Sequence, residues 1–200
     1  MKITIIIMAS GLSTRFLSNK LLAKFKGQSI MELILDKTAD FRISSNDLQI
    51  NRLVLTRTQQ VYDYCRQKDV DVILHELPDR NDAIRLGIKQ EHVFDSDACI
   101  FCACDQPLLR QESIASLIEA YMENGEGIYR LSYEDTAGNP ILFSKRYFKE
   151  LSTLPAKKGG AYLAGKHPNE VTCVEAIDKW ELFDVDTPED LVILEKVERD

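Results

Sequence analysis

Residues 2–16 read KITIIIMASGLSTRF and combine a predicted strand with a candidate ligand-binding loop. The run Ile3–Met8 is apolar except for Thr4 and rich in β-branched side chains, which is typical of a strand covered on both faces. Small residues follow at positions 9–11 and 13, so the backbone there can approach a ligand and surround phosphate oxygens with N–H groups. Arg15 and Lys20 then add two cations where a triphosphate would lie. The stretch matches neither the phosphate-loop motif nor the dinucleotide fingerprint, and an ordinary strand-to-helix loop with two solvated basic residues is the alternative.

The rest of the chain alternates short apolar runs with longer amphipathic stretches. The expected strands are Ile3–Met8, Arg52–Thr56, Asp71–His75, Ala98–Cys104, Gly127–Tyr133, Ile141–Phe143, Glu170–Ala176 and Leu182–Val185. The expected helices are Ser29–Asp40, Gln59–Lys68, Asn81–Glu91, Gln111–Asn124, Lys145–Leu151, Gly159–Lys166 and Pro188–Arg199. No repeat or Pro/Gly/Ser linker divides the sequence, so we predict one domain over residues 1–200. Its fold class is α/β, a three-layer sandwich with a mostly parallel sheet.

Two of the expected helices begin with capping residues. Ser29 and Glu32 form a capping box, and Thr187 can cap the last helix with Pro188 at its first position. The sequence DVDT at 184–187 therefore brings two carboxylates to a strand end directly before a helix.

The composition limits the partners. Of 200 residues, 44% are hydrophobic and 28% charged, as in ordinary globular proteins. The net charge of −7 argues against a general nucleic-acid binder, which needs a basic face. Five cysteines, an odd number, favour the reducing cytoplasm over a disulfide framework. No apolar run reaches the roughly 20 residues of a membrane span, so we expect a cytoplasmic protein without membrane or nucleic-acid partners.

A second candidate site follows the strand Ala98–Cys104, where the sequence reads CDQPLL at 104–109. Open α/β sheets bind ligands beyond the carboxyl ends of their strands. Asp105 stands at such an end and can hold a Mg²⁺ ion that bridges phosphate oxygens. A turn or helix-cap role for Asp105 is the alternative.

The spacing of three cysteines invites a metal site, but a strand argues against it. In an extended chain Cys102 and Cys104 point to one face and Cys99 to the other. We therefore expect them to pack as small apolar side chains.

Four blocks, in order, resemble motifs of the molybdenum-cofactor nucleotidyltransferases. MASGLSTRF…NKLL at 8–22 resembles L-A-[AG]-G-x-S-x-R-x-G-x-x-K, and CDQPLL at 104–109 resembles G-D-Q-P-L-L. GNPILF at 138–143 resembles G-[NH]-P-V-L-F, and DVDTPEDL at 184–191 resembles D-[IV]-D-T-P-E-D-L. The resemblance implies a Rossmann-like nucleotide-diphospho-sugar transferase architecture. The Q-P-L-L form and the lack of a double glycine at 10–11 are closer to the cytidylyltransferase branch than to the guanylyltransferase branch.

The resemblance also implies roles for individual residues. Asp105 would bind Mg²⁺, and Asp186 is a candidate second metal ligand, with a helix-entry role beside Thr187 as its alternative. Arg15, Lys20 and Asp105 are the expected catalytic residues. The expected nucleotide contacts are Ala9, Ser10, Gly11, Ser13, Arg15, Lys20 and Asp82.

The implied reaction moves CMP from CTP onto the phosphate of molybdopterin and releases pyrophosphate. The attacking phosphate has a second pKa of roughly 6 and is already ionised near neutral pH, so no general base is needed. This agrees with three histidines that all lie outside the matching motifs. Alternatives are GTP as donor, a sugar phosphate as acceptor, or a non-catalytic accessory protein that binds nucleotide or cofactor. A molybdoenzyme that receives the cofactor is a possible partner.

The match departs from the family at several positions. Residues 156–162 read AKKGGAY where the family has G-D-x-G-A-R, so Lys157 and Lys158 either bind an acceptor phosphate or form a solvated pair at a helix entry. Residues 77–87 lack the Gly/Ser-rich stretch that helps relatives to read the base. Cys104 replaces a glycine, and Ser10 stands where alanine or glycine is common.

Overall fold

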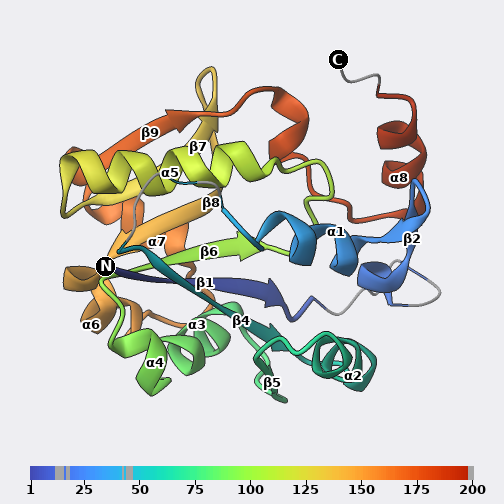
Figure 1. Ribbon diagram of the computed structural model, residues 1–200, viewed down its shortest axis with the longest axis horizontal. Helices are drawn as coiled ribbons and strands as arrows, with labels where there is room; N and C mark the ends of the chain where they lie inside the picture. Colours follow the sequence, from blue (N-terminus) through green and yellow to red (C-terminus); the bar gives the residue numbers. More distant parts are fainter. Residues whose placement is uncertain (12–15, 17–18, 42, 44–46, 198–200) are drawn as a thin grey trace.

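The computed structural model describes residues 1–11, 16, 19–41, 43 and 47–197. These residues form a seven-stranded sheet in the order β5-β4-β1-β6-β8-β7-β9, together with a small β2-β3 hairpin. The strands of the sheet are β1 Lys2–Ala9, β4 Gln49–Thr56, β5 Val72–Leu74, β6 Ala98–Ala103, β7 Ile128–Tyr133, β8 Thr136–Ser144 and β9 Val171–Glu175. Only β8 runs against the others in this sheet, as the pairing of β6 and β7 with β8 shows (Figure 1). The prediction of a mostly parallel sheet is confirmed.

Helices cover both faces of the sheet and bury two separate cores. One core joins the sheet to α1 Ile30–Lys37, α2 Gln59–Gln67, α5 Gln111–Asn124 and α8 Pro188–Glu195. The other joins it to α3 Arg80–Ile88, α4 Glu91–Phe94, α6 Phe148–Leu151 and α7 Gly160–Lys166. Along β1, Ile5 and Ile7 enter the first core and Ile6 enters the second, as the alternation of a strand requires. The fold is therefore a three-layer α/β sandwich.

Local chemistry fixes where several elements begin and how closely they pack. The Ser29 hydroxyl accepts a hydrogen bond from the Glu32 backbone N–H at 3.1 Å, and Thr187 caps α8 in a capping box with Asp190. Gly87 lets α3 lie close to the sheet, because an added Cβ would meet Leu55 Cδ1 at 3.0 Å.

The structure differs from the sequence predictions at several places. The expected strand Leu182–Val185 is wrong: a 3₁₀ helix, Lys179–Leu182, begins at the Asp178 capping box, and the buried Glu181 carboxylate accepts hydrogen bonds from the Arg110 and Ile177 backbone N–H groups. The hairpin of β2 Lys24–Phe25 and β3 Gln28–Ser29 was not expected. Strand β8 is longer than predicted because it forms a hairpin with β7.

The described helices include none that is long and apolar enough to cross a membrane.

Candidate active site

The candidate site lies where β1, β4 and β6 end. These strands are parallel neighbours, so Ala9, Thr56 and Ala103 close the same edge of the sheet. Asp105 follows β6 by two residues, and its backbone carbonyl accepts a hydrogen bond from the Val185 N–H at 2.9 Å. This bond holds the segment that leads to α8 against the end of β6. Motifs far apart in the sequence therefore meet at the edge where open α/β sheets bind ligands.

Lys20 is the centre of this edge. Its ammonium nitrogen, Nζ, lies 2.7 Å from Asp105 Oδ2 and 3.2 Å from Asp186 Oδ1. It also donates a hydrogen bond to the Val185 carbonyl at 2.8 Å. Only 5% of the residue is exposed, although it carries a full charge. The structure thus brings together three of the residues that the sequence motifs single out.

The charges around Lys20 determine its protonation. Burial alone lowers the pKa of an ammonium group, but attraction and hydrogen bonding to Asp105 and Asp186 outweigh burial and leave the pKa of Lys20 above its ordinary value. Lys20 therefore stays charged at neutral pH.

Asp184 adds a third carboxylate to this group, which we call the Lys20 cluster: Lys20, Asp105, Asp184 and Asp186. Although part of the Asp184 residue is exposed, its pKa rises to about 6. Burial of the carboxyl group is the main cause, and repulsion from Asp105 and Asp186 adds to it. A hydrogen bond from Gln106 opposes this shift. Among the described residues of the cluster, one ammonium therefore faces three acids.

The donor set of the cluster fits a divalent cation. No three His, Cys, Asp or Glu side chains among the described residues are arranged to hold a metal ion without other ligands. However, Mg²⁺ is commonly held by one or two carboxylates, with substrate phosphates and water as its other ligands. Asp105 and Asp186 both reach one ammonium, and their side chains are 27% and 58% exposed, so both are open to an incoming ion. Gln106 Oε1, which is buried and has no hydrogen-bond partner among the described residues, is a further neutral oxygen next to Asp105.

The loop after β1 reaches the same edge. Ala9 is buried at the end of β1, and an added Cβ on Gly11 would lie 3.8 Å from Cε of Lys20. The Ser10 hydroxyl lies 2.9 Å from the Leu55 carbonyl and 2.8 Å from Nε2 of His75. Ser13 and Arg15, also expected at this site, lie outside the described residues.

The sequence motifs do not single out two residues near the site, His75 and Asp184. His75 lies outside the family motifs, yet it directly follows β5 and contacts Ser10. Its position at the carboxyl end of a predicted strand is the sequence feature that could have identified it as a site residue. Asp184 was noted only as part of the sequence DVDT.

Asp82 lies at the start of α3 and is engaged within that helix. Its Oδ1 accepts hydrogen bonds from Asn81 Nδ2 at 2.9 Å and from Arg85 Nη1 at 3.1 Å. Asn81 is buried, and its Oδ1 accepts a hydrogen bond from the Lys157 backbone N–H at 2.8 Å. The two segments that depart from the family motifs, 77–87 and 156–162, therefore pack against each other.

The remaining sequence expectations concern lysines and cysteines. Lys157 and Lys158 are both exposed, and Nζ of Lys158 lies 5.3 Å from the centre of the Tyr162 ring.

Cys99 belongs to one core and Cys102 and Cys104 to the other, so the prediction that they pack on opposite faces is confirmed.

Comparison with known proteins agrees with this fold. No curated protein matches the chain. Rv0371c from Mycobacterium tuberculosis H37Rv has a TM-score of 0.79 and 24% identity, covering 99% of this chain and 100% of that one. Its manganese complex has a TM-score of 0.73 and 23% identity, covering 98% and 100%.

Two further solved structures share the fold. The CTP complex of CMP:2-keto-3-deoxy-manno-octonic acid synthetase has a TM-score of 0.71 at 14% identity, covering 98% of this chain and 97% of that one. Molybdopterin-guanine dinucleotide biosynthesis protein A from Archaeoglobus fulgidus has a TM-score of 0.71 at 16% identity, covering 96% and 97%. Such identities show the nucleotide-diphospho-sugar transferase fold alone. The model of the MobA-like NTP transferase domain, in contrast, matches residues 5–171, so this chain belongs to that family of nucleotidyltransferases.

Proposed function

We propose that the protein transfers CMP from CTP onto the terminal phosphate of molybdopterin, with release of pyrophosphate. The observation that carries this proposal is the Lys20 cluster. Its buried ammonium contacts Asp105 at 2.7 Å and Asp186 at 3.2 Å at the edge where β1, β4 and β6 end. In a nucleotidyl transfer two anions must approach each other and charge develops on the leaving pyrophosphate. A site that combines a fixed cation with acids able to hold a metal ion suits this task.

The chain's own residues have distinct tasks in this proposal. Lys20 and Arg15 bind phosphate oxygens of the triphosphate, and the backbone of 9–11 lies against the nucleotide. Asp105 and Asp186 would hold a Mg²⁺ ion, which would supply charge neutralisation at the phosphates. The acids that would bind the cation are those that now hold Lys20.

The choice of cytosine and of a pterin acceptor rests on motif form. The Q-P-L-L element and the single glycine of the first loop favour the cytidylyltransferase branch, whereas GTP or a sugar phosphate would use the same chemistry. A non-catalytic accessory protein is the second candidate, and the AKKGGAY segment at 156–162 favours it because the usual acceptor-side acid is missing there. The exposed pair Lys157 and Lys158 is then either an acceptor-phosphate contact or a solvated surface.

Pyrophosphate release tests the proposal. Each of the four NTPs is offered with Mg²⁺, with and without molybdopterin, and release is expected only with CTP and the acceptor together. Asp105→Ala is expected to lower turnover by about a hundredfold or more, by analogy with other preorganised electrostatic contacts. Its matched control is Glu119→Gln on the exposed surface of α5, which should turn over normally.

Other outcomes are equally informative. Nucleotide binding without turnover under every combination would favour the accessory protein. Release with GTP and molybdopterin, but not with CTP, would identify GTP as the donor nucleotide. Full Mg²⁺-dependent activity in Asp105→Ala would remove the metal assignment.

A further inference from the structure

Ser10 and His75 form a buried polar contact that the proposed chemistry does not use. Ser10 follows β1 and His75 follows β5, and β4 lies between these strands in the sheet. The Ser10 hydroxyl bridges the gap, since it reaches both the Leu55 carbonyl on β4, at 2.9 Å, and His75 Nε2, at 2.8 Å. His75 is only 8% exposed. The carboxyl ends of three neighbouring strands are thus tied together by one side chain.

The hydrogen bonds fix the tautomer of His75. The Leu77 backbone N–H lies 3.2 Å from Nδ1, and an N–H group can only donate, so Nδ1 accepts and the ring proton is on Nε2. Nε2–H then donates to the Ser10 oxygen, and the Ser10 O–H donates to the Leu55 carbonyl. Burial, and secondly the charge of Arg57, lowers the pKa of His75, so the ring is neutral at physiological pH.

The direction of these bonds excludes two catalytic roles. A serine beside a histidine suggests a nucleophile and its base, but a base must accept the serine proton. Here the imidazole donates to Ser10 and the serine proton points to a carbonyl, so the hydroxyl is not activated. A neutral ring also adds no positive charge for a phosphate.

We propose that Ser10 and His75 are a positioning pair for the nucleotide, an inference that rests on the proposed function. The pair joins the loop 9–11, whose Gly11 faces Lys20, to the segment that runs from His75 through Leu77 to the start of α3. Both segments follow the carboxyl ends of parallel strands, where open α/β sheets bind ligands. Holding both at a fixed separation lowers the ordering cost of NTP binding without adding a catalytic group.

Paired substitutions separate the two ends of His75. The amide of Gln places a donor near the position of Nε2 and can keep the bond to Ser10. The amide of Asn places an acceptor near the position of Nδ1, so it keeps the Leu77 bond but does not reach Ser10. His75→Asn and His75→Gln are therefore matched variants that differ in the contact under test. Ser10→Ala removes the same contact from the other side.

The experiment measures CTP binding at equilibrium, KM for CTP and kcat for the three variants, with thermal unfolding as a check of the fold. Ser10→Ala and His75→Asn should raise Kd and KM for CTP about five- to tenfold, the size expected for one lost hydrogen bond, with kcat within about twofold. His75→Gln should stay within about twofold of the wild type for all three quantities.

The outcomes separate this inference from the proposed function. If the wild type binds no NTP, the proposed function fails. If the wild type binds CTP and His75→Asn binds it equally well, the positioning role is wrong while the proposed function stands. A kcat loss above about a hundredfold in Ser10→Ala at unchanged KM would also overturn it, because it would assign the hydroxyl to the chemical step. Should His75→Asn fail to fold, Ser10→Ala and His75→Gln still give the comparison.

Discussion

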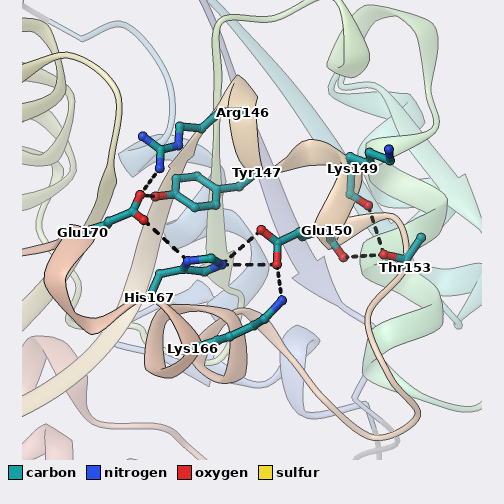
Figure 2. Close-up of polar contacts among 8 residues, drawn as sticks. All are labelled: Arg146, Tyr147, Lys149, Glu150, Thr153, Lys166, His167 and Glu170. Atoms are coloured by element: carbon teal, nitrogen blue, oxygen red, sulfur yellow. Dashed lines mark hydrogen bonds and ion pairs between the residues drawn. The ribbon is translucent and has the colours of Figure 1, made fainter.

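Two polar clusters stand at opposite edges of the sheet. The Lys20 cluster lies where the parallel strands end. The other, which we call the Glu150–Glu170 network, lies where β8 ends and β9 begins (Figure 2). Its members are Arg146, Tyr147, Glu150, Lys166, His167 and Glu170. Both clusters join segments that are distant in the sequence, yet their charges are arranged in opposite ways.

In the Glu150–Glu170 network each acid contacts at least two donors, and His167 contacts both acids. Glu150 contacts Lys166 at 2.6 Å and His167 at 3.0 Å, and Glu170 accepts from Arg146 and from the buried Tyr147 hydroxyl. The pKa of Glu150 is lowered mainly by its bond to Lys166, and that of Glu170 mainly by its bond to Tyr147.

In the Lys20 cluster the pKa of Asp184 shifts in the opposite direction, since it is raised to about 6. Acids that are already satisfied by local donors have little to gain from a ligand, whereas acids in excess gain from an added cation. The balance of charge, rather than the number of ion pairs, distinguishes a structural network from a site prepared for a cation.

The largest effect that would separate the two clusters is on turnover. Lys20→Met should lower nucleotidyl transfer by about a hundredfold or more, because it removes a preorganised cation from the phosphates. Lys166→Met is the matched control, since it removes an ammonium from a carboxylate contact of nearly the same length at the other edge. It should leave turnover within about twofold, because Lys166 is more than half exposed and belongs to the network at the opposite edge of the sheet. Equal losses in both variants would contradict the contrast.

Divalent cations should stabilise the protein through one cluster only. At a Mn²⁺ or Mg²⁺ concentration about a hundredfold above Kd, binding to the folded state adds about 2.7 kcal/mol to the free energy of unfolding. For a chain of this length that corresponds to a rise in Tm of roughly 5–10 °C. Asp186→Asn should reduce the rise and Glu170→Gln should preserve it, as thermal scans with and without metal would show. A rise that survives in Asp186→Asn but not in Glu170→Gln would reverse the assignment.

The sequence predicts the layers of this fold well, and the reason is local. Mostly apolar runs such as Ile3–Met8 are found in strands covered on both faces, and the Ser29 and Thr187 caps begin helices where expected. The prediction of a strand over Leu182–Val185 is wrong because its apolar residues resemble a strand, whereas the structure has a 3₁₀ helix up to Leu182, in which the buried Glu181 accepts from the Ile177 and Arg110 backbone N–H groups. That competition involves Arg110, which is distant in sequence.

The site was predictable in part. Motif order identified Lys20, Asp105 and Asp186, and the structure brings these three into contact. The raised pKa of Asp184 was beyond reach, because it depends on where three carboxyl groups lie relative to one another. The contact of Ser10 with His75 was equally hidden, since it crosses β4 between two strand ends.

A moderate effect should distinguish the clusters in stability alone. Tyr147→Phe removes the buried hydroxyl that donates to Glu170, while Arg146 continues to contact that carboxylate. We expect a loss of about 1–2 kcal/mol in the free energy of unfolding, measured by urea denaturation, because a hydrogen bond to a charged group is lost. Turnover should be unchanged. A loss of turnover with unchanged stability would place the network in the catalytic machinery instead.

The smallest effect is a pair of pH dependences with opposite signs. Glu150 has a folded-state pKa below the ordinary 4.5, so its ionised form stabilises the fold above that pH, and this contribution is lost as the pH falls through the folded-state pKa. Glu150→Gln should therefore destabilise the protein at pH 7, by about 0.5 kcal/mol or less since the pair is at the surface, and the difference should vanish in acid.

Asp184 behaves in the opposite way, because its pKa rises from 3.8 to about 6 in the fold. Its charge opposes folding fully above pH 6, and the opposition disappears as the pH falls toward 3.8. Asp184→Asn should consequently stabilise the metal-free protein at pH 7 and lose that advantage in acid, as urea denaturation across this range would reveal. Bound Mg²⁺ should shrink the gain at pH 7, because the cation would offset the same repulsion between carboxylates. If both substitutions destabilised the protein at pH 7, the difference in charge balance between the two edges would be too small to matter.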